Sequence, residues 1–406
     1  MTSIRPTVSF SIPIVLRILM VISAVFLSVF PLGACGDDSG AGAGDAGTGS
    51  DALADAQTGS DGSAGQDGST QADSALPSDG GADSGAPPSG WLRTEGNRIL
   101  REDDSAFRGR GANLHDTRSC WACAWYQPDV EEVKRRADEL VDVWGANFVR
   151  LLLESYPDDQ GGAVQWQPVL DDPAYLADVI EIVDHLGTKP GVYVLLSHWV
   201  DPSFTAEGWP SAGTIDSWEL LADVFRDYSC VLYGLVNEPE ANYDGSQDAA
   251  CWTAMNDTVA AIRAVEDQQA SPHHVIAVQG TRAWARVLDY YITHPITAGG
   301  GVNIAYETHV YDSESEFDDR FVTPSQTLPV IIGEFGPADG YMTLADSQTL
   351  MDEAENLEIP YLAWTFHPRC PPNLLVDNSG GGCGVNMSLV PTAWGQLLMD
   401  RLAAPY

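Results

Sequence analysis

Short apolar runs alternate with longer amphipathic stretches from residue 107 to residue 406. The short runs are rich in β-branched and aromatic residues, which predicts strands, and the stretches between them are typical of helices. Parallel strands joined by crossover helices produce this alternation. We expect eight strands, at 110–114, 147–153, 192–197, 231–236, 275–279, 303–308, 330–333 and 361–365. Eight such units predict an α/β fold, a closed (β/α)8 or TIM barrel.

Residues 129–144 show the helical pattern clearly. Val133, Ala137, Leu140 and Trp144 recur every three or four residues, so one face of this helix can pack on the sheet. The stretches 176–186, 217–228, 249–266 and 344–357 have the same pattern. Ahead of the first strand, residues 91–107 predict a β-hairpin that turns at 95–97 and closes the bottom of the barrel.

The first 34 residues predict a signal peptide. The apolar stretch 18–30 is too short for a convincing membrane span, and Arg5 and Arg17 precede it. It is followed by Leu32, Gly33, Ala34 and Cys35, a tetrapeptide that resembles the lipobox of bacterial lipoproteins. That resemblance implies removal of residues 1–34, lipid modification of Cys35, and an extracytoplasmic protein anchored to a bacterial membrane, at the outer membrane or cell surface. An ordinary secretory signal with a chance cysteine is the alternative.

Residues 35–90 predict a disordered tether between Cys35 and the folded domain. They consist mainly of Gly, Ala, Ser and Asp, with ten aspartates and no Lys or Arg, and they offer almost nothing to bury. Such a segment cannot offset the entropy cost of ordering. Calcium-binding loops would need a fixed ligand spacing, which these aspartates lack. Residues 91–406 hold all twelve tryptophans and have the size of a single barrel domain.

The formal net charge of -38 limits the partners of this chain. An acidic surface repels nucleic acid, polyanionic glycans and anionic membranes, but it does not affect a neutral polysaccharide. We therefore expect no nucleic-acid partner, membrane contact only through Cys35, and a monomer. Adaptation to salt or simple solubility can explain the excess of acidic residues.

Six cysteines remain when Cys35 is set aside, and an even number in an exported protein predicts disulfides. Fifteen pairings are possible, and Cys370 with Cys383 is the pair that we favour because both fall in one long loop. Cys120 and Cys123 have the spacing of redox and zinc motifs. Further ligands are not near them in the sequence, so a loop disulfide is the better interpretation.

Two glutamates, Glu238 and Glu334, each follow an apolar strand. In parallel barrels, catalytic groups lie at the carboxyl ends of the strands. Glycoside hydrolysis requires two such carboxyl groups, one protonated to assist the leaving sugar and one ionised to attack the anomeric carbon or to direct water at it. One acid alone is more simply a helix cap or an ion-pair partner, but two at successive strand ends favour catalysis.

Residues 91–406 resemble glycoside hydrolase family 5, a family of retaining (β/α)8 hydrolases. The resemblance rests on residue types that follow one another at successive strand ends: Arg150, His198, Asn237, Glu238, His309, Tyr311, Glu334 and Trp364, together with a first strand at 110–114. It implies that Glu238 is the acid/base and Glu334 the nucleophile.

The chemistry of the supporting residues agrees with these roles. Arg150 and Tyr311 can donate hydrogen bonds to Glu334 and keep it ionised. Asn237 suits a sugar 2-hydroxyl, and His309 can orient a catalytic carboxylate. Glu238 has no obvious cationic partner in the sequence, so an ionised neighbour should raise its pKa.

Four further residues are candidates for sugar binding. Trp364 and Trp199 offer flat rings to the apolar faces of pyranoses. His198 and His115 follow strands and could orient hydroxyl groups, although a single histidine is more often structural than catalytic.

The sequence thus predicts a retaining glycoside hydrolase acting on a neutral β-linked polysaccharide or oligosaccharide, in first place an endo-β-1,4-glucanase. It predicts no cofactor and no metal. A β-1,4-mannanase or another β-glycosidase of the same family is the alternative. In a different class, a non-catalytic glycan-binding surface lipoprotein would be expected to lack Glu238 or Glu334, and a metal-dependent hydrolase would need a ligand cluster that these scattered histidines do not form.

Overall fold

The computed structural model describes residues 90–118, 129–153, 168–198, 208–239, 242–378 and 385–405. Within these ranges eight strands form a closed parallel barrel in the order β10-β3-β4-β5-β6-β7-β8-β9. The strands are β3 (Arg110–His115), β4 (Phe148–Leu153), β5 (Tyr193–His198), β6 (Val231–Gly234), β7 (Ile276–Gln279), β8 (Ile304–Val310), β9 (Val330–Phe335) and β10 (Tyr361–Ala363). The predicted TIM barrel is therefore confirmed, and each of its eight strands lies where the apolar runs placed it.

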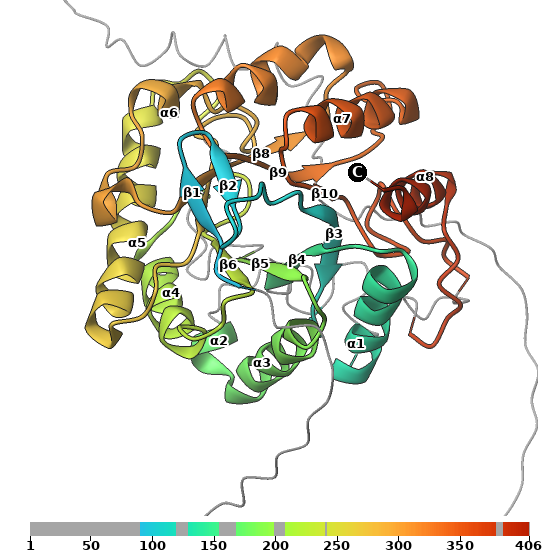
Figure 1. Cartoon of the computed structure of the whole chain (residues 1–406), viewed down its shortest axis with the longest axis horizontal. Helices are drawn as coiled ribbons and strands as arrows, with labels where there is room; N and C mark the ends of the chain where they lie inside the picture. Colours follow the sequence, from blue (N-terminus) through green and yellow to red (C-terminus); the bar gives the residue numbers. More distant parts are fainter. Residues whose placement is uncertain are drawn as a thin grey trace, which may run out of the picture.

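Helices surround the barrel, as Figure 1 shows. They are α1 (Val130–Asp138), α2 (Pro168–Asp171), α3 (Pro173–Gly187), α4 (Ala212–Val224), α5 (Asp248–Gln269), α6 (Asp289–Thr293), α7 (Leu344–Asn356) and α8 (Ala393–Ala403). A π-helical turn, Glu139–Val143, extends α1. The helix expected from residue 217 begins earlier, because Ser211 and Thr214 form a capping box at its start. In the part of the chain that is described, no helix is both long and apolar enough to cross a membrane.

The side chains of each strand alternate between two apolar clusters. Leu195 and Leu232 point into the barrel, whereas Val194 and Leu196 pack outward in the large cluster between strands and helices. This alternation decides which polar residues can reach the interior of the barrel. On β5 it assigns Ser197 to the inside, where its hydroxyl accepts a hydrogen bond from Arg150, and His198 to the outside.

A hairpin closes the bottom of the barrel, as predicted. Strands β1 (Arg93–Glu95) and β2 (Arg98–Leu100) pair antiparallel and lie in front of the barrel in Figure 1. Leu92, Ile99 and Phe107 join the inner cluster, and the ring of Phe107 lies edge-on to that of Tyr193 at 4.8 Å. Complete burial of an aromatic side chain of this kind stabilises a fold by roughly 1.5–3 kcal/mol.

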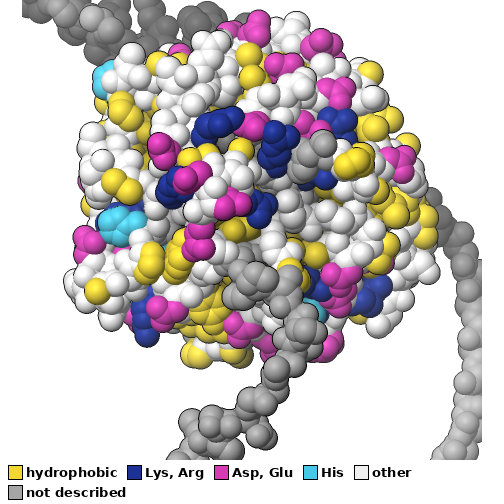
Figure 2. All heavy atoms as spheres, in the orientation of Figure 1, with side chains coloured by type: hydrophobic (Ala, Val, Ile, Leu, Met, Phe, Trp, Pro, Cys, Tyr) yellow, Lys and Arg dark blue, Asp and Glu magenta, His cyan; other side chains and the backbone are white. Residues whose placement is uncertain are grey.

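The surface around the hairpin carries acidic and basic side chains next to one another (Figure 2). Arg93 contacts both Glu95 and Asp104, and Arg108 contacts Glu358 at 2.6 Å. Exposed ion pairs contribute little to stability, typically about 0–1 kcal/mol each. Their presence shows that the acidic excess is partly neutralised on this face.

The cysteines depart from the prediction that all six form disulfides. Cys230 and Cys251 are buried free thiols, and burial raises their pKa values to about 11 and about 12. Cys370 is disulfide-bonded. Cys120, Cys123 and Cys383 lie outside the described residues, so the pairing of Cys370 with Cys383 stays a prediction. The even count was misleading because a cysteine behaves as a small apolar residue in a helix-to-barrel interface.

Candidate active site

Glu334 lies in β9 at a point where pairing with β8 is irregular. Thr308 pairs with Ile332, but His309 pairs with Glu334, so Gly333 is an additional residue in β9, a β-bulge. Bulges next to active sites change the direction in which a side chain points. The side chain of Glu334 is 3% exposed and contacts residues of the barrel interior.

The guanidinium group of Arg150 donates hydrogen bonds to side chains from four parts of the barrel. Its Nη1 donates to Glu334 Oε1 at 2.6 Å and to Asn113 Oδ1 at 2.9 Å. Its Nη2 donates to Asn237 Oδ1 at 2.9 Å and to Ser197 Oγ at 3.2 Å. Arg150 is completely buried, so these contacts fix the orientation of the Glu334 carboxylate.

Tyr311 donates its phenolic hydrogen to the other oxygen, Glu334 Oε2, at 2.9 Å. The pKa of Glu334 is raised, because burial and the Glu238 charge outweigh the charges of His309 and Arg150 and the Tyr311 hydrogen bond, which lower it. Burial and the nearby Glu334 charge raise the pKa of Tyr311 well above its usual value, so the phenol stays a donor. The ionised form of Glu334 therefore depends on these three partners.

Glu238 lies beyond the end of β6 in a left-handed backbone conformation, with φ of 48°. Its backbone N–H donates to Gln279 Oε1 at 2.5 Å. A non-glycine residue adopts this conformation at an energy cost, and such strain is concentrated at functional sites. The Glu238 side chain is 13% exposed, so it borders both the barrel interior and the open carboxyl-terminal face.

His309 is the cationic partner that the sequence did not reveal for Glu238. Its Nδ1 lies 2.9 Å from Glu238 Oε1, and its Nε2 lies 3.1 Å from Glu307 Oε1. Burial alone would lower the pKa of His309, but the charges of Glu334, Glu238 and Glu307 raise it to about 9. With a carboxyl oxygen at each ring nitrogen, both nitrogens can donate and the ring carries a positive charge.

The two candidate catalytic carboxyl groups are close together. One oxygen of Glu238, one oxygen of Glu334 and a nitrogen of His309 all lie within 4.8 Å of one another. In retaining glycosidases the two carboxyl groups are about 5–5.5 Å apart, against roughly 6.5–9.5 Å in inverting ones. The arrangement is therefore suited to proton transfer and nucleophilic attack. The same three groups lie close enough together to hold a metal ion.

Of the residues predicted to bind sugar, two lie near this cluster. His115 is the last residue of β3 and is buried, and its ring lies 5.4 Å from that of Trp364. Burial lowers the pKa of His115 to about 3, so it is a neutral hydrogen-bonding group. Trp364 follows β10 and is 6% exposed.

The prediction for His198 is wrong. Its Nε2 lies 3.0 Å from the hydroxyl of Ser217 on α4, and its ring lies edge-on to Trp218 at 5.1 Å. Burial lowers its pKa to about 3. His198 occupies an outward position of β5, so it packs in the helical layer instead of facing the Glu238–Glu334 pair. Trp199 lies outside the described residues.

Polar residues at inward strand positions were missed by the sequence reasoning. Asn113 donates to the carbonyl of Gly333 at 3.0 Å, Gln279 binds the backbone of Glu238, and Glu307 contacts Arg150 Nε at 3.1 Å. All are completely buried, together with Ser197. A polar side chain at an inward position of an otherwise apolar strand is the signal that could have identified them.

Two aromatic residues beyond β6 and β7 were also missed. Tyr243 is 57% exposed, and its ring lies 5.1 Å from that of Trp284, at an angle of 79°. Ala283, Trp284 and Ala285 all have positive φ, from 49° to 62°. This loop therefore holds an aromatic pair on the same side of the barrel as Glu238.

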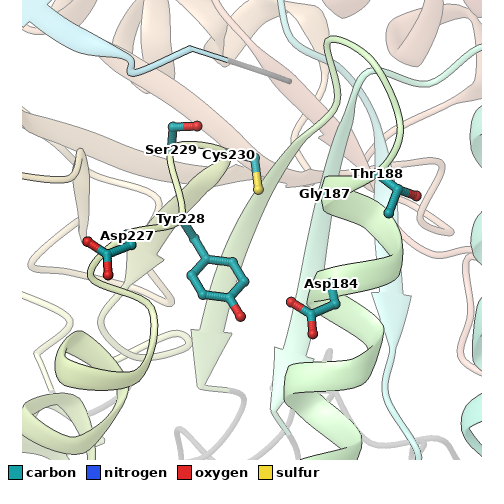
Figure 3. A pocket seen from close by; sticks show the side chains of 7 residues that line it. All are labelled: Asp184, Gly187, Thr188, Asp227, Tyr228, Ser229 and Cys230. Carbon is teal, nitrogen blue, oxygen red and sulfur yellow. The ribbon is translucent and has the colours of Figure 1, made fainter. Parts of the chain in front are cut away.

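A hollow of about 390 Å³ lies at the other end of the molecule. Figure 3 shows that Asp184 and Thr188 of the α3 end and Tyr228 and Cys230 ahead of β6 surround it. This is the amino-terminal side of the strands, away from Glu238 and Glu334. The hollow is therefore separate from the candidate active site.

Residues 100–369 match the family model described as "Cellulase (glycosyl hydrolase family 5)". A search of curated protein sequences finds no match.

Solved structures share the fold at low sequence identity. A β-glucanase from Saccharophagus degradans is 20% identical, with a TM-score of 0.60 over 78% of this chain and 94% of the other. The catalytic domain of an endoglucanase from Thermobifida fusca, in complex with cellotetraose, is 18% identical, with a TM-score of 0.59 over 78% and 98%. A β-mannanase from Streptomyces thermolilacinus with mannohexaose is 23% identical, with a TM-score of 0.55 over 76% and 93%.

Proposed function

Since this chain belongs to glycoside hydrolase family 5, a family of retaining β-glycanases, we propose that it is an endo-acting β-1,4-glucanase. The observation that carries the proposal is the pair of carboxyl groups, Glu238 and Glu334, with oxygens within 4.8 Å of each other at the carboxyl ends of the strands. Around them, Arg150, Tyr311 and His309 supply the donors that the chemistry needs.

In the first step, Glu334 attacks the anomeric carbon while the bond to the leaving sugar oxygen breaks. Glu238 transfers its proton to that oxygen. Arg150 and Tyr311 hold both oxygens of Glu334, so the attacking lone pair has a fixed direction. The product of this step is a glycosyl ester on Glu334.

In the second step, water attacks the anomeric carbon and Glu334 leaves as a carboxylate. Glu238, now ionised, removes a proton from the water. Two inversions restore the β configuration of the sugar. Asn237, held by Arg150, lies beside Glu238 where it can bind the sugar 2-hydroxyl.

The preference for glucan rests on similarity and on aromatic surface. A β-glucanase and an endoglucanase crystallised with cellotetraose share the fold, and Trp364, Tyr243 and Trp284 offer rings for pyranose faces. A β-1,4-mannanase is the second candidate, because a mannanase is among the similar structures. A binding protein without activity is disfavoured, because both carboxyl groups are present and paired.

The test is incubation of the purified protein with soluble glucan, mannan, xylan and xyloglucan, followed by sizing of the products. Oligomers of several lengths from glucan alone would support the proposal. Release of a single short product would indicate exo action, and cleavage of mannan alone would replace glucan by the second candidate. Absence of cleavage of every polymer and of aryl β-glycosides would refute a hydrolase.

We also propose that Cys35 carries a lipid that anchors the protein to a bacterial membrane, outside the cytoplasm. The lipobox-like tetrapeptide that ends at Cys35 supports this proposal. Gly36 follows the cysteine, whereas an aspartate at that position would favour retention in the inner membrane. The outer membrane or cell surface is therefore the proposed location.

A further inference from the structure

Glu307 is a third carboxyl group beneath the two candidate catalytic ones. It lies on β8, two residues before His309, and is completely buried. Its Oε1 lies 3.1 Å from Arg150 Nε and 3.1 Å from His309 Nε2. One oxygen of Glu307 thus contacts both cations of the active site.

The backbone of β9 leaves room for this carboxyl group. A Cβ atom on Gly333, the bulged residue, would lie only 2.0 Å from Glu307 Oε1. Gly333 directly precedes Glu334, so the bulge both aims Glu334 and makes space for Glu307. A side chain at residue 333 would force Glu307 away from Arg150 and His309.

The buried charges of this cluster indicate the role of Glu307. The cluster holds three carboxyl groups, Glu238, Glu307 and Glu334, and two cations, Arg150 and His309. Burial of unpaired charge is costly, so the cluster is most stable when it is neutral. Two carboxylates then balance the two cations, and one carboxyl group keeps a proton.

The contacts indicate which group that is. Glu307 forms ion pairs with both cations, and burial, which would raise its pKa, is outweighed by the charge of Arg150 and by His309, so its pKa is lowered. Glu334 accepts from Arg150 and Tyr311. Glu238 and Glu334 face each other, with oxygens within 4.8 Å, so the remaining proton belongs to this pair, and the proposed function requires it on Glu238 before the first step.

We infer that Glu307 is a positioning residue. Its carboxylate offsets part of the positive charge of His309 and Arg150, so that Glu238 keeps the proton needed for the first step. This inference rests on the proposed function. The inference goes beyond that function because it gives a role to Glu307, a residue beneath the carboxyl groups that would act on the substrate. Without Glu307, both Glu238 and Glu334 could ionise and the cluster, with its two cations, would still be neutral. Glu238 would therefore lose its proton more readily.

The other groups that face this cluster do not change its balance of three carboxyl groups and two cations. Gln279 on β7, whose side chain hydrogen-bonds to Glu307, and Tyr311 after β8 are neutral groups. His115 at the end of β3 is neutral because burial lowers its pKa to about 3. Arg286, beyond β7, is paired with Asp312.

The experiment is a pH profile of kcat/KM for cellopentaose, comparing the unmutated protein with Glu307→Gln and Glu307→Asp. Removing a buried negative charge lowers the pKa values of all neighbouring groups, so Glu307→Gln should move both limbs of the profile to lower pH, by about one unit or more. Glu307→Asp keeps the charge, so its profile should keep its position even if the rate falls. A lower rate for Glu307→Gln with unmoved limbs would mean that Glu307 only fills space and would overturn the inference.

A leaving-group comparison adds a second readout. A dinitrophenyl β-cellobioside needs no proton on its leaving group. At neutral pH, the fold loss of activity caused by Glu307→Gln should therefore be at least about tenfold smaller with this substrate than with cellopentaose. Equal losses on both substrates would count against the inference. The proposed function is judged separately, by whether the unmutated protein cleaves any β-glycan.

Nitrogen NMR on the unmutated protein covers the case in which the Glu307 variants do not fold. With ¹⁵N-labelled histidine, the His309 resonances, assigned by comparison with His309→Asn, should show both ring nitrogens protonated near neutral pH. An unprotonated Nε2 at pH 6 would show that Glu307 does not hold a charged imidazolium, and would overturn the inference.

Discussion

Replacing Tyr311 by Phe removes one hydroxyl group and tests how Glu334 is kept ionised. The phenol donates to Glu334 Oε2 at 2.9 Å in a buried site, and this hydrogen bond opposes the rise in pKa that burial imposes on Glu334. A hydrogen bond to a charged group contributes roughly 1.5–3 kcal/mol, and one pKa unit corresponds to about 1.4 kcal/mol. The pKa of Glu334 should therefore rise by about 1 to 2 units in Tyr311→Phe.

The sign follows from which form the phenol stabilises. It stabilises the carboxylate, so its loss favours the protonated acid, and activity should disappear at higher pH than in the unmutated protein. The acidic limb of the kcat profile should move up by about 1 to 2 pH units, and well below that limb the rate should fall about 10- to 100-fold. KM should change little, because the phenol contacts Glu334 and not the sugar.

The assay is hydrolysis of cellopentaose across pH, with Tyr306→Phe as the matched control. Tyr306 lies on β8, the strand that Tyr311 follows, and its buried hydroxyl accepts from the Ile296 backbone at 3.0 Å, away from the carboxylates. That variant should lose roughly 1–3 kcal/mol of stability and keep the acidic limb unchanged. An unmoved acidic limb with a raised KM in Tyr311→Phe would refute the reasoning and assign Tyr311 to substrate binding.

Four further predictions concern other parts of the protein. Glu334→Ala should be nearly inert, and azide should restore turnover and give an α-glycosyl azide, as seen by proton NMR; a β-product would contradict a nucleophilic Glu334. Glu238→Ala should lose activity on oligosaccharides but keep most of the first step on dinitrophenyl glycosides, measured as the burst of released phenol, and equal losses would remove Glu238 from the acid role. Trp284→Ala should raise KM for cellopentaose by about two- to tenfold with a smaller change in kcat, since packing of a flat aromatic ring against an apolar sugar face contributes about 0.5–1.5 kcal/mol; an unchanged KM would place Trp284 outside the sugar path. Cys35→Ser should move the protein from the membrane fraction to the soluble fraction, and continued membrane association would end the anchor proposal.

The sequence predicted the barrel well because eight apolar runs of similar length leave few other arrangements. Glu238 and Glu334 were identifiable because each lies two residues after the last apolar residue of a strand-forming run. His198 was misassigned because a run of apolar residues shows where a strand lies but not which of its residues point inward. On β5 the structure shows that Ser197 points into the barrel, toward Arg150, and that the next residue, His198, points outward.

The charge distribution of the site was harder to predict. Glu307 lies within a strand, two residues before His309, and only the closure of the barrel brings it against Arg150 on a distant strand. The bulge at Gly333, which turns Glu334 toward His309, depends on pairing between strands and has no local sequence signal. The sequence therefore predicted the chemical groups of the site but not the partner of Glu238.

The place where the chain enters the domain has a consequence for access to large substrates. The carbonyl of Gly90 accepts a hydrogen bond from Tyr193 at 2.8 Å, beneath the barrel and beside the hairpin. Glu238 and Glu334 lie at the opposite pole. Anything attached through the residues before Gly90 therefore joins the protein at the pole farthest from its catalytic groups. An enzyme attached in this way keeps its open end clear of the attachment point, so that polymers too large to pass between the enzyme and the surface that holds it can still reach the catalytic groups.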